Sequence, residues 1–152
     1  MNKWGFWGTV ETVAKVVGIL AGLTAGGVAF TLGGWGWASP FQLAAWIVLV
    51  VATLGALAQF AIRIKQKDRF TLVFAEANLL GHLGLVIALL RPGFPDLLPL
   101  SFAGAYVLGQ LAKLVFLRVT GYKEDGNSNA ALFGLTVFQA VVYLAFGVLV
   151  AL

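Results

Sequence analysis

Five long apolar runs make up most of the chain, and short segments rich in glycine, proline and charged residues separate them. Each run is close to the ~20 residues that an α-helix needs to cross the hydrocarbon core of a bilayer. None of them alternates polar and apolar residues over about ten positions, as a membrane-spanning β-strand does. The sequence therefore predicts an all-α, polytopic transmembrane bundle of five spanning helices in a single domain. The spans are expected at about 9–32, 41–64, 70–90, 97–119 and 130–152.

Composition agrees with a chain surrounded by lipid. Hydrophobic residues make up 61% of it and charged residues 11%, whereas about a quarter of a soluble domain is charged. The net charge of +4 comes from basic residues between the apolar runs, where they orient a membrane protein, so a nucleic-acid partner is not expected. There is no cysteine, which excludes disulfides, thiolate nucleophiles and cysteine-ligated metals.

Lysine and arginine are shared unevenly between the two sides of the predicted bundle. With the N-terminus inside, one outer connection carries Arg91 alone, and the inner side carries the basic residues Lys3, Arg63, Lys65, Lys67, Arg69, Arg118 and Lys123. Cytoplasmic loops are enriched in lysine and arginine. We therefore expect a multi-pass protein of the inner (cytoplasmic) membrane with its N-terminus inside and its C-terminus outside.

Small residues and one pair of charges stand out in the first run. Gly18, Gly22 and Gly26 are spaced four apart, which allows another helix to approach closely in lipid. This spacing fits packing against the chain's own helices, and it also fits a homo-oligomer or a contact with subunits of a larger membrane complex. Glu11 and Lys15 are also four apart and suit an ion pair, which we expect to anchor the helix at the membrane surface.

The third run contains the stretch FAEANLLGHLG (74–84), with three polar side chains among apolar ones. Asn78 and His82 lie four apart and so share a helix face, where the imidazole is expected to bond to Asn78 or to a carbonyl. Glu76 is rotated by about 120° from His82. Because ionisable groups within a membrane usually pair, Glu76 is expected to meet Lys113, which lies at a similar depth in the fourth run.

The predicted polar groups gather in the inner half of the bundle. The outer half offers only hydroxyl groups, including that of Tyr106. This asymmetry predicts either a buried network that fixes helix register or a pocket open to the cytoplasm. In the pocket interpretation, the protein is a small binding or transport component, or a membrane subunit of a larger complex. The candidate ligand-binding residues are Glu76, Asn78, His82, Gln110, Lys113 and Gln139.

Two other functions stay open. One is a structural, assembly or pigment-binding subunit, in which His82 is an axial ligand to a flat macrocycle. A five-coordinate pigment is then the simpler version, because His82 is the only histidine and Met1 the only methionine. The other is a membrane enzyme acting on a lipid or amphiphile. The sequence has no HExxH, GxSxG or phosphate-loop motif and no cluster of carboxylates, so a non-enzymatic role is favoured, and no cofactor is identified.

Overall fold

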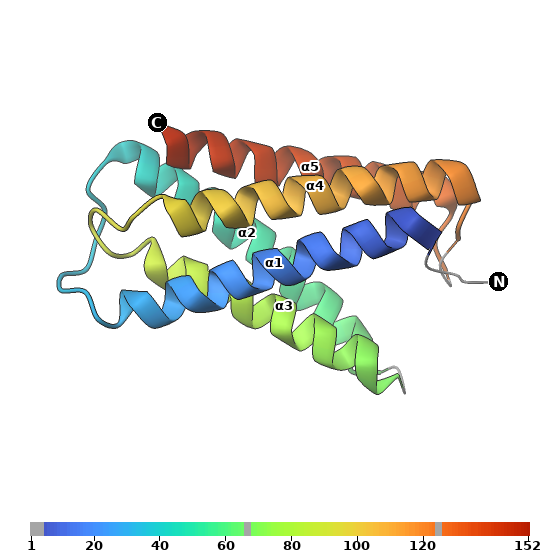
Figure 1. Ribbon diagram of the computed structural model, residues 1–152, viewed down its shortest axis with the longest axis horizontal. Helices are drawn as coiled ribbons and strands as arrows, with labels where there is room; N and C mark the ends of the chain where they lie inside the picture. Colours follow the sequence, from blue (N-terminus) through green and yellow to red (C-terminus); the bar gives the residue numbers. More distant parts are fainter. Residues whose placement is uncertain (1–4, 66–67, 124–125) are drawn as a thin grey trace.

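The computed structural model describes residues 5–65, 68–123 and 126–152, and over these residues it is helical with no strand (Figure 1). Lys3 and Lys67, two of the basic residues on which the orientation was predicted, lie outside the described residues. The helices are α1 (Gly5–Ala29), α2 (Pro40–Arg63), α3 (Arg69–Ala88), α4 (Leu97–Thr120) and α5 (Asn129–Ala151). All five are long and apolar enough to cross a membrane, which confirms the five predicted spans to within a few residues.

Local chemistry explains where the helices begin and end. The Ser39 hydroxyl accepts a hydrogen bond of 3.1 Å from the Gln42 amide at the start of α2, as N-cap serines do. Asp68 caps α3, and the hydrogen bond from the Thr71 hydroxyl holds the pKa of the Asp68 carboxyl below its usual value. Gly121 ends α4 with a φ of 60°, a left-handed conformation that glycine adopts without strain.

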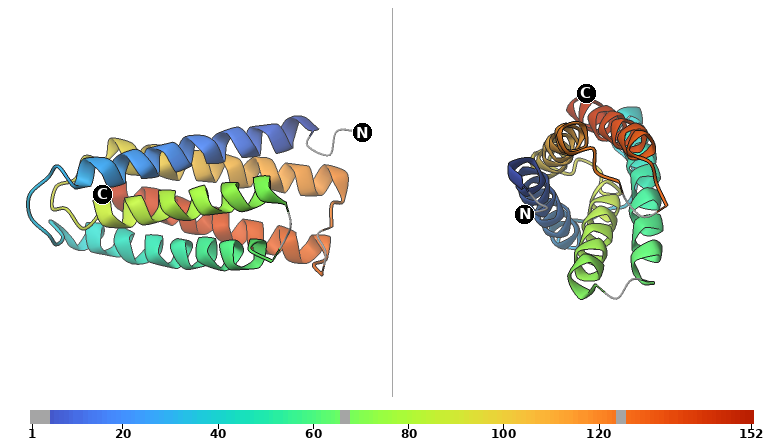
Figure 2. Two further views of the ribbon diagram at one scale, coloured as in Figure 1. Left: turned by 90° about the horizontal axis from the view of Figure 1, so that it is seen from below. Right: turned by 90° about the vertical axis from the view of Figure 1, so that its right-hand side faces the viewer.

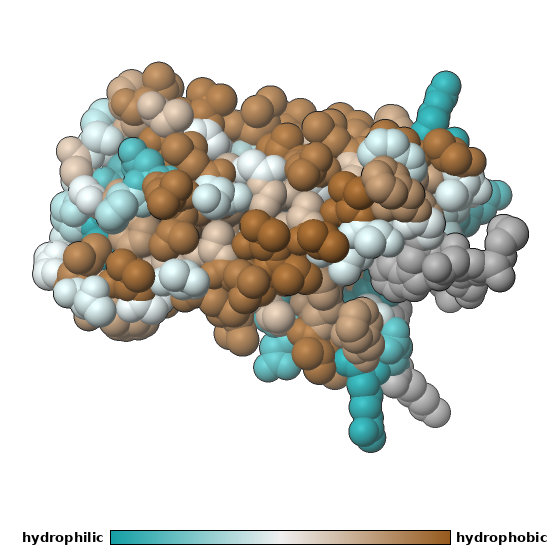
Figure 3. All heavy atoms as spheres, viewed as in Figure 1, coloured by the Kyte–Doolittle hydropathy of each residue, from teal (hydrophilic) through white to brown (hydrophobic). Residues whose placement is uncertain are grey.

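The five helices pack side by side in a ring, in the order α1, α4, α5, α2, α3 and back to α1 (Figure 2). The N-terminus and the α2–α3 and α4–α5 connections lie at one end, here called the basic end. The C-terminus and the α1–α2 and α3–α4 connections lie at the other, here called the aromatic end, which carries Trp35 and Trp37. The surface along the helices is mainly hydrophobic (Figure 3). The interior of the ring is therefore the place where polar side chains can meet one another rather than lipid.

Glycines bring α1 and α3 into backbone contact. A Cβ atom on Gly22 would overlap the carbonyl oxygen of Gly81, and one on Gly26 would lie 2.7 Å from the Cα of Gly84. Such distances leave no room for a side chain at the crossing. The close helix contact predicted from the small-residue spacing is thus confirmed, and it lies within the chain.

Gly18 completes this stripe on the side of α4. A Cβ atom there would lie 2.5 Å from Cε2 of Tyr106, so the tyrosine ring rests directly on the α1 backbone. All three glycines of the stripe are buried by helices of the same chain. Gly18, Gly22 and Gly26 are therefore covered within the chain, and a homo-oligomer or a contact with subunits of a larger complex stays a prediction.

The aromatic end is closed by the α1–α2 connection, which folds against the end of α3. Arg91 is buried, donates to the Gly34 carbonyl at 2.5 Å and places its Cζ 3.6 Å from the centre of the Trp35 ring. The Gly36 amide donates to the Leu90 carbonyl at 2.7 Å. A cation over an aromatic face is attractive, and more so when desolvated, so this end is held by several independent contacts.

Candidate functional site

His82 lies at the centre of the ring, and its side chain is fully buried, with 0% exposed. Its Nδ1 atom is 2.7 Å from the backbone carbonyl oxygen of Asn78, one turn earlier on α3. Its Nε2 atom is 2.8 Å from the hydroxyl oxygen of Tyr143 on α5. The predicted bond between His82 and Asn78 or a carbonyl is thus confirmed, and the acceptor is the main chain of Asn78 rather than its side-chain amide.

The hydrogen-bond partners of the imidazole define which nitrogen of His82 carries the proton in its neutral form. A backbone carbonyl only accepts hydrogen bonds, so Nδ1 must be the donor toward Asn78. In a neutral imidazole the other nitrogen is then an acceptor, and the Tyr143 hydroxyl donates to it. The protein therefore holds His82 in one tautomer, with an acceptor nitrogen directed at α5.

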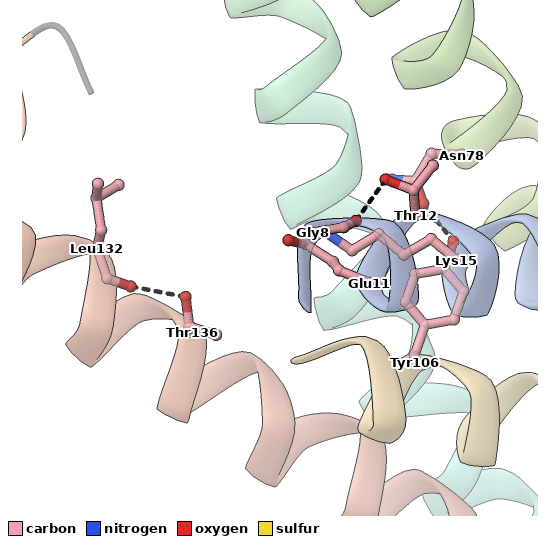
Figure 4. Close-up of polar contacts among 8 residues, drawn as sticks. All are labelled: Gly8, Glu11, Thr12, Lys15, Asn78, Tyr106, Leu132 and Thr136. Carbon is pink, nitrogen blue, oxygen red and sulfur yellow. Dashed lines mark hydrogen bonds and ion pairs between the residues drawn. The ribbon is translucent and has the colours of Figure 1, made fainter. Parts of the chain in front are cut away.

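A second hydrogen bond joins α3 to α4 at the same level. The Tyr106 hydroxyl donates to the side-chain oxygen of Asn78, and the two side chains point toward one another in Figure 4. The rings of Tyr106 and Tyr143 stack with their centres 4.6 Å apart. We call the four residues that three helices bring together here the polar cluster: Asn78, His82, Tyr106 and Tyr143.

Buried polar groups continue from the polar cluster toward the basic end. Gln110 lies one turn beyond Tyr106 on α4, is 2% exposed, and its Oε1 atom has no hydrogen-bond partner in the described part of the chain. Thr136 on α5 is 1% exposed and bonds to the Leu132 carbonyl of its own helix (Figure 4). A buried acceptor without a partner costs about 1–3 kcal/mol, which makes Gln110 the least satisfied polar group of this interior.

The ion pair in α1 takes part in this interior. The Lys15 ammonium donates to the Glu11 carboxylate at 2.5 Å, and the two side chains are only 17% and 18% exposed. Lys15 Cγ would lie 3.5 Å from a Cβ atom on Gly109, so the lysine packs against α4 beside Gln110. The pair is drawn with Asn78 and Tyr106 in Figure 4. The predicted Glu11–Lys15 ion pair is thus confirmed, it faces α4, and its role as an anchor at the membrane surface stays a prediction.

Glu76 does not belong to this interior. It is exposed on the outward face of α3, in line with Val73 and Leu80, which are 62% and 48% exposed. Lys113 is half-buried on α4, and the two form no ion pair in the described chain. The predicted Glu76–Lys113 pair is wrong because a rotation of about 120° turns Glu76 away once His82 faces inward.

The remaining predicted site residue, Gln139, is half-buried one turn from Tyr143 on α5. The structure therefore places Asn78, His82 and Gln110 in the ring interior, with Gln139 at its margin. Whether any of them binds a ligand stays a prediction. The sequence alone does not identify Tyr143, and it predicts Tyr106 only as one of the hydroxyl groups of the outer half.

Directly beyond the polar cluster, toward the aromatic end, the buried side chains that follow His82 are hydrocarbon. We call this set the apolar cap, whose members are at most 6% exposed: Leu85, Leu89, Phe94, Phe102 and Phe146. The ring of Phe102 packs edge-on against His82 with the ring centres 5.0 Å apart. The interior thus changes from polar to apolar within one helical turn of His82.

In this arrangement both nitrogens of His82 lie within hydrogen-bond distance of protein groups. One ring nitrogen donates to the Asn78 carbonyl, and the other lies 2.8 Å from the Tyr143 hydroxyl. An axial ligand needs a free nitrogen with open space in front of it. Both nitrogens of His82 are therefore engaged by protein groups, and its role as an axial ligand stays a prediction.

Comparisons with known proteins add no functional assignment, since no family model, curated protein or solved structure matches the chain. Within residues 5–65, 68–123 and 126–152, no group of three or more His, Cys, Asp or Glu residues could hold a metal ion. The arrangement of the polar cluster, Gln110 and the Glu11–Lys15 pair is therefore the basis for a functional proposal.

Proposed function

We propose that this protein is a small membrane binding or transport component that admits hydrogen-bond-donating solutes, chiefly water and protons, from the basic end as far as His82. The observation that carries the proposal is the buried Oε1 atom of Gln110, which has no partner among the described residues. A buried acceptor of this kind is stabilised when a visiting donor bonds to it. Water bridging buried polar groups is the simplest such donor.

The polar cluster has the chemistry to receive a proton. The acceptor nitrogen of His82 faces the Tyr143 hydroxyl, and a tyrosine oxygen can accept as well as donate. If Nε2 gains a proton, the hydroxyl rotates and accepts from it, so the hydrogen bond survives with its direction reversed. His82 lies 13 residues from the start of α3 at the basic end. A solute entering from that end would therefore pass along roughly 20 Å of helix to reach it.

Blockage beyond His82 follows from the apolar cap. Leu85, Phe102 and Phe146 are at most 1% exposed and offer no hydrogen-bonding group. A polar solute would have to give up its hydrogen bonds to pass them, which costs several kcal/mol for each unpaired group. The proposed activity is therefore one-sided access and binding, with passage only if the cap rearranges.

The basic end is proposed to face the cytoplasm of the inner membrane. Its described basic residues are Arg63, Lys65, Arg69, Arg118 and Lys123, whereas Arg91 is the basic residue of the aromatic end. This bias agrees with the positive-inside rule. In that orientation the cluster would exchange water and protons with the cytoplasm.

Cysteine accessibility tests the proposal directly, because the chain has no cysteine of its own. In proteoliposomes, Gln110→Cys should react with silver ion added at the basic end and with little added at the aromatic end. Leu85→Cys, in the apolar cap, is the matched buried control and should react from neither side. Asn127→Cys, exposed in the α4–α5 connection, marks the basic end. If Gln110→Cys is as unreactive as Leu85→Cys, one-sided access is ruled out.

A structural or assembly role is the second candidate, because His82 and Asn78 are satisfied by protein groups alone. The two functions differ in proton movement. With a pH-sensitive dye trapped in proteoliposomes, the binding or transport function predicts proton uptake or release after a pH step, and predicts that Gln110→Leu abolishes it. The structural function predicts the same small signal for both proteins and for empty liposomes.

A further inference from the structure

A cavity lies at the aromatic end, separate from the polar cluster. It has a volume of about 170 Å³ and opens between the start of α2, the α3–α4 connection and the end of α5. This volume equals that of five or six water molecules at ~30 Å³ each. The cavity is thus large enough for a small head group and a few methylene groups.

Its walls are of two kinds. The apolar side includes Phe94, which is 6% exposed, together with Leu149 and Val150 near the end of α5. The polar rim consists of Ser39, Gln42 and Asp96. A ligand that fills it must therefore be amphiphilic, with hydrocarbon against α5 and a polar group at the rim.

Two of the three rim residues are already engaged within the protein. The Ser39 hydroxyl accepts from the Gln42 amide at 3.1 Å. The Gln42 side chain donates to the carbonyls of Leu89 and Arg91 at 2.8 and 2.9 Å, and accepts from the Ala38 amide at 2.9 Å. These groups shape the rim, and their hydrogen-bonding capacity is largely used.

Asp96 is the exception. It stands at the N-cap of α4 without a side-chain capping bond, and it forms no ion pair in the described chain. Arg91, the cation of the same connection, is engaged by the Gly34 carbonyl and the Trp35 ring. The cavity therefore presents, beside an apolar wall, one carboxylate that has no ion-pair partner among the described residues.

We infer that this cavity binds an amphiphile with a primary ammonium head, whose nitrogen bonds to Asp96 and whose first methylenes pack on Phe94 and Leu149. An ammonium donates charge-assisted hydrogen bonds to a carboxylate. Trp35 and Trp37 lie at the same end, and tryptophan is enriched at the level of lipid head groups. The site does not depend on the function proposed for the polar cluster.

Native mass spectrometry of the full chain in nanodiscs tests the inference. In an equal mixture of phosphatidylethanolamine and phosphatidylcholine, the protein should retain the ethanolamine lipid with about tenfold preference, the ratio that 1.4 kcal/mol of charge-assisted bonding supplies. Asp96→Asn should remove the preference, and Asp96→Glu should restore most of it. Leu149→Trp should reduce retention by filling the cavity, whereas Leu144→Trp, on an exposed position of α5, should not.

A second set of nanodiscs, made of phosphatidylcholine with added dodecylamine, distinguishes a bilayer lipid from a single-chain amine as the source of the ammonium. Retention of dodecylamine that is lost in Asp96→Asn supports the site even without an ethanolamine preference. The inference is overturned if neither amine is retained above phosphatidylcholine, or if retention is unchanged in both Asp96→Asn and Leu149→Trp.

Discussion

The interior differs on the two sides of His82, although the same helices form both. Along one face of α4, successive turns carry Phe102, Tyr106 and Gln110, so the face changes from apolar to polar. On α3 the same change runs from Leu85 to Asn78. Because these steps coincide in level on neighbouring helices, the boundary is a property of the assembled ring rather than of one helix.

The two sides of His82 contribute differently to the stability and chemistry of the interior. The apolar cap behaves as an ordinary packed core, in which every side chain contributes dispersion and excludes water. The basic side contains the polar cluster, an ion pair and a buried acceptor without a partner. The glycine crossing of α1 and α3 joins the two sides. We expect substitutions at the crossing and in the apolar cap to lower the free energy of unfolding more than substitutions on the basic side.

The largest effect is expected at the crossing itself. Gly22→Ala places a Cβ atom on the carbonyl oxygen of Gly81, and a backbone atom cannot move aside as a flexible side chain can. We expect the free energy of unfolding, measured by titration with sodium dodecyl sulfate, to fall by about 3 kcal/mol or more. Gly27→Ala, where a Cβ atom meets nothing within 4 Å, is the matched control. Equal effects of the two substitutions would contradict the crossing.

The apolar cap should not tolerate a polar group. Leu85 is fully buried, so Leu85→Asn loses packing and buries an amide among hydrocarbon side chains. The free energy of unfolding should fall by about 2–3 kcal/mol, whereas Leu85→Met, which conserves volume, should cost less than about 1.5 kcal/mol. A tolerated asparagine would show that the cap is hydrated and that the contrast between the two sides is false.

A smaller effect is expected at the boundary. Tyr143→Phe removes the hydroxyl that donates to Nε2 of His82 and keeps the ring that stacks on Tyr106. The unpartnered nitrogen should lower the free energy of unfolding by about 1–2 kcal/mol. Tyr122→Phe, at a residue 44% exposed, is the control and should be neutral. An unchanged free energy of unfolding in Tyr143→Phe would contradict the hydrogen bond between Tyr143 and His82.

The smallest effect on stability is expected at Gln110. Gln110→Met keeps the volume and removes an acceptor that has no protein partner, so the free energy of unfolding should change by less than about 0.5 kcal/mol or rise. Proton movement in proteoliposomes should nevertheless be lost. A destabilisation above about 1 kcal/mol would instead identify Gln110 as a structural group.

Sequence reasoning predicted the helices well because span length and turn residues are local properties. It also placed Asn78 and His82 on one face, since their spacing of four is fixed by helix geometry. The expected Glu76–Lys113 pair is wrong because residues at a similar depth need not face one another, and the angle of about 120° to His82 favours another face for Glu76. Sequence reasoning predicted the Glu11–Lys15 ion pair from the spacing of four, but it did not predict that the pair faces α4.

The partner of His82 could not be predicted in the same way. Tyr143 lies 61 residues away, and it reaches the imidazole only because α5 sits between α4 and α2 in the ring. No local pattern specifies that order. One local signal points to aromatic contacts around the imidazole. Aromatic residues spaced three or four apart share a helix face, as do Tyr143 and Phe146 on α5 and Phe102 and Tyr106 on α4.

Nitrogen NMR of His82 tests the polar cluster most directly, because the chain contains a single histidine. The protein is labelled with ¹⁵N-histidine, purified without a histidine tag and placed in bilayers. The hydrogen bonds predict a proton on Nδ1 and, in the neutral imidazole, an acceptor Nε2 whose chemical shift changes in Tyr143→Phe. An Nδ1 atom without a proton, or an Nε2 chemical shift that is the same in Tyr143→Phe, would contradict the arrangement.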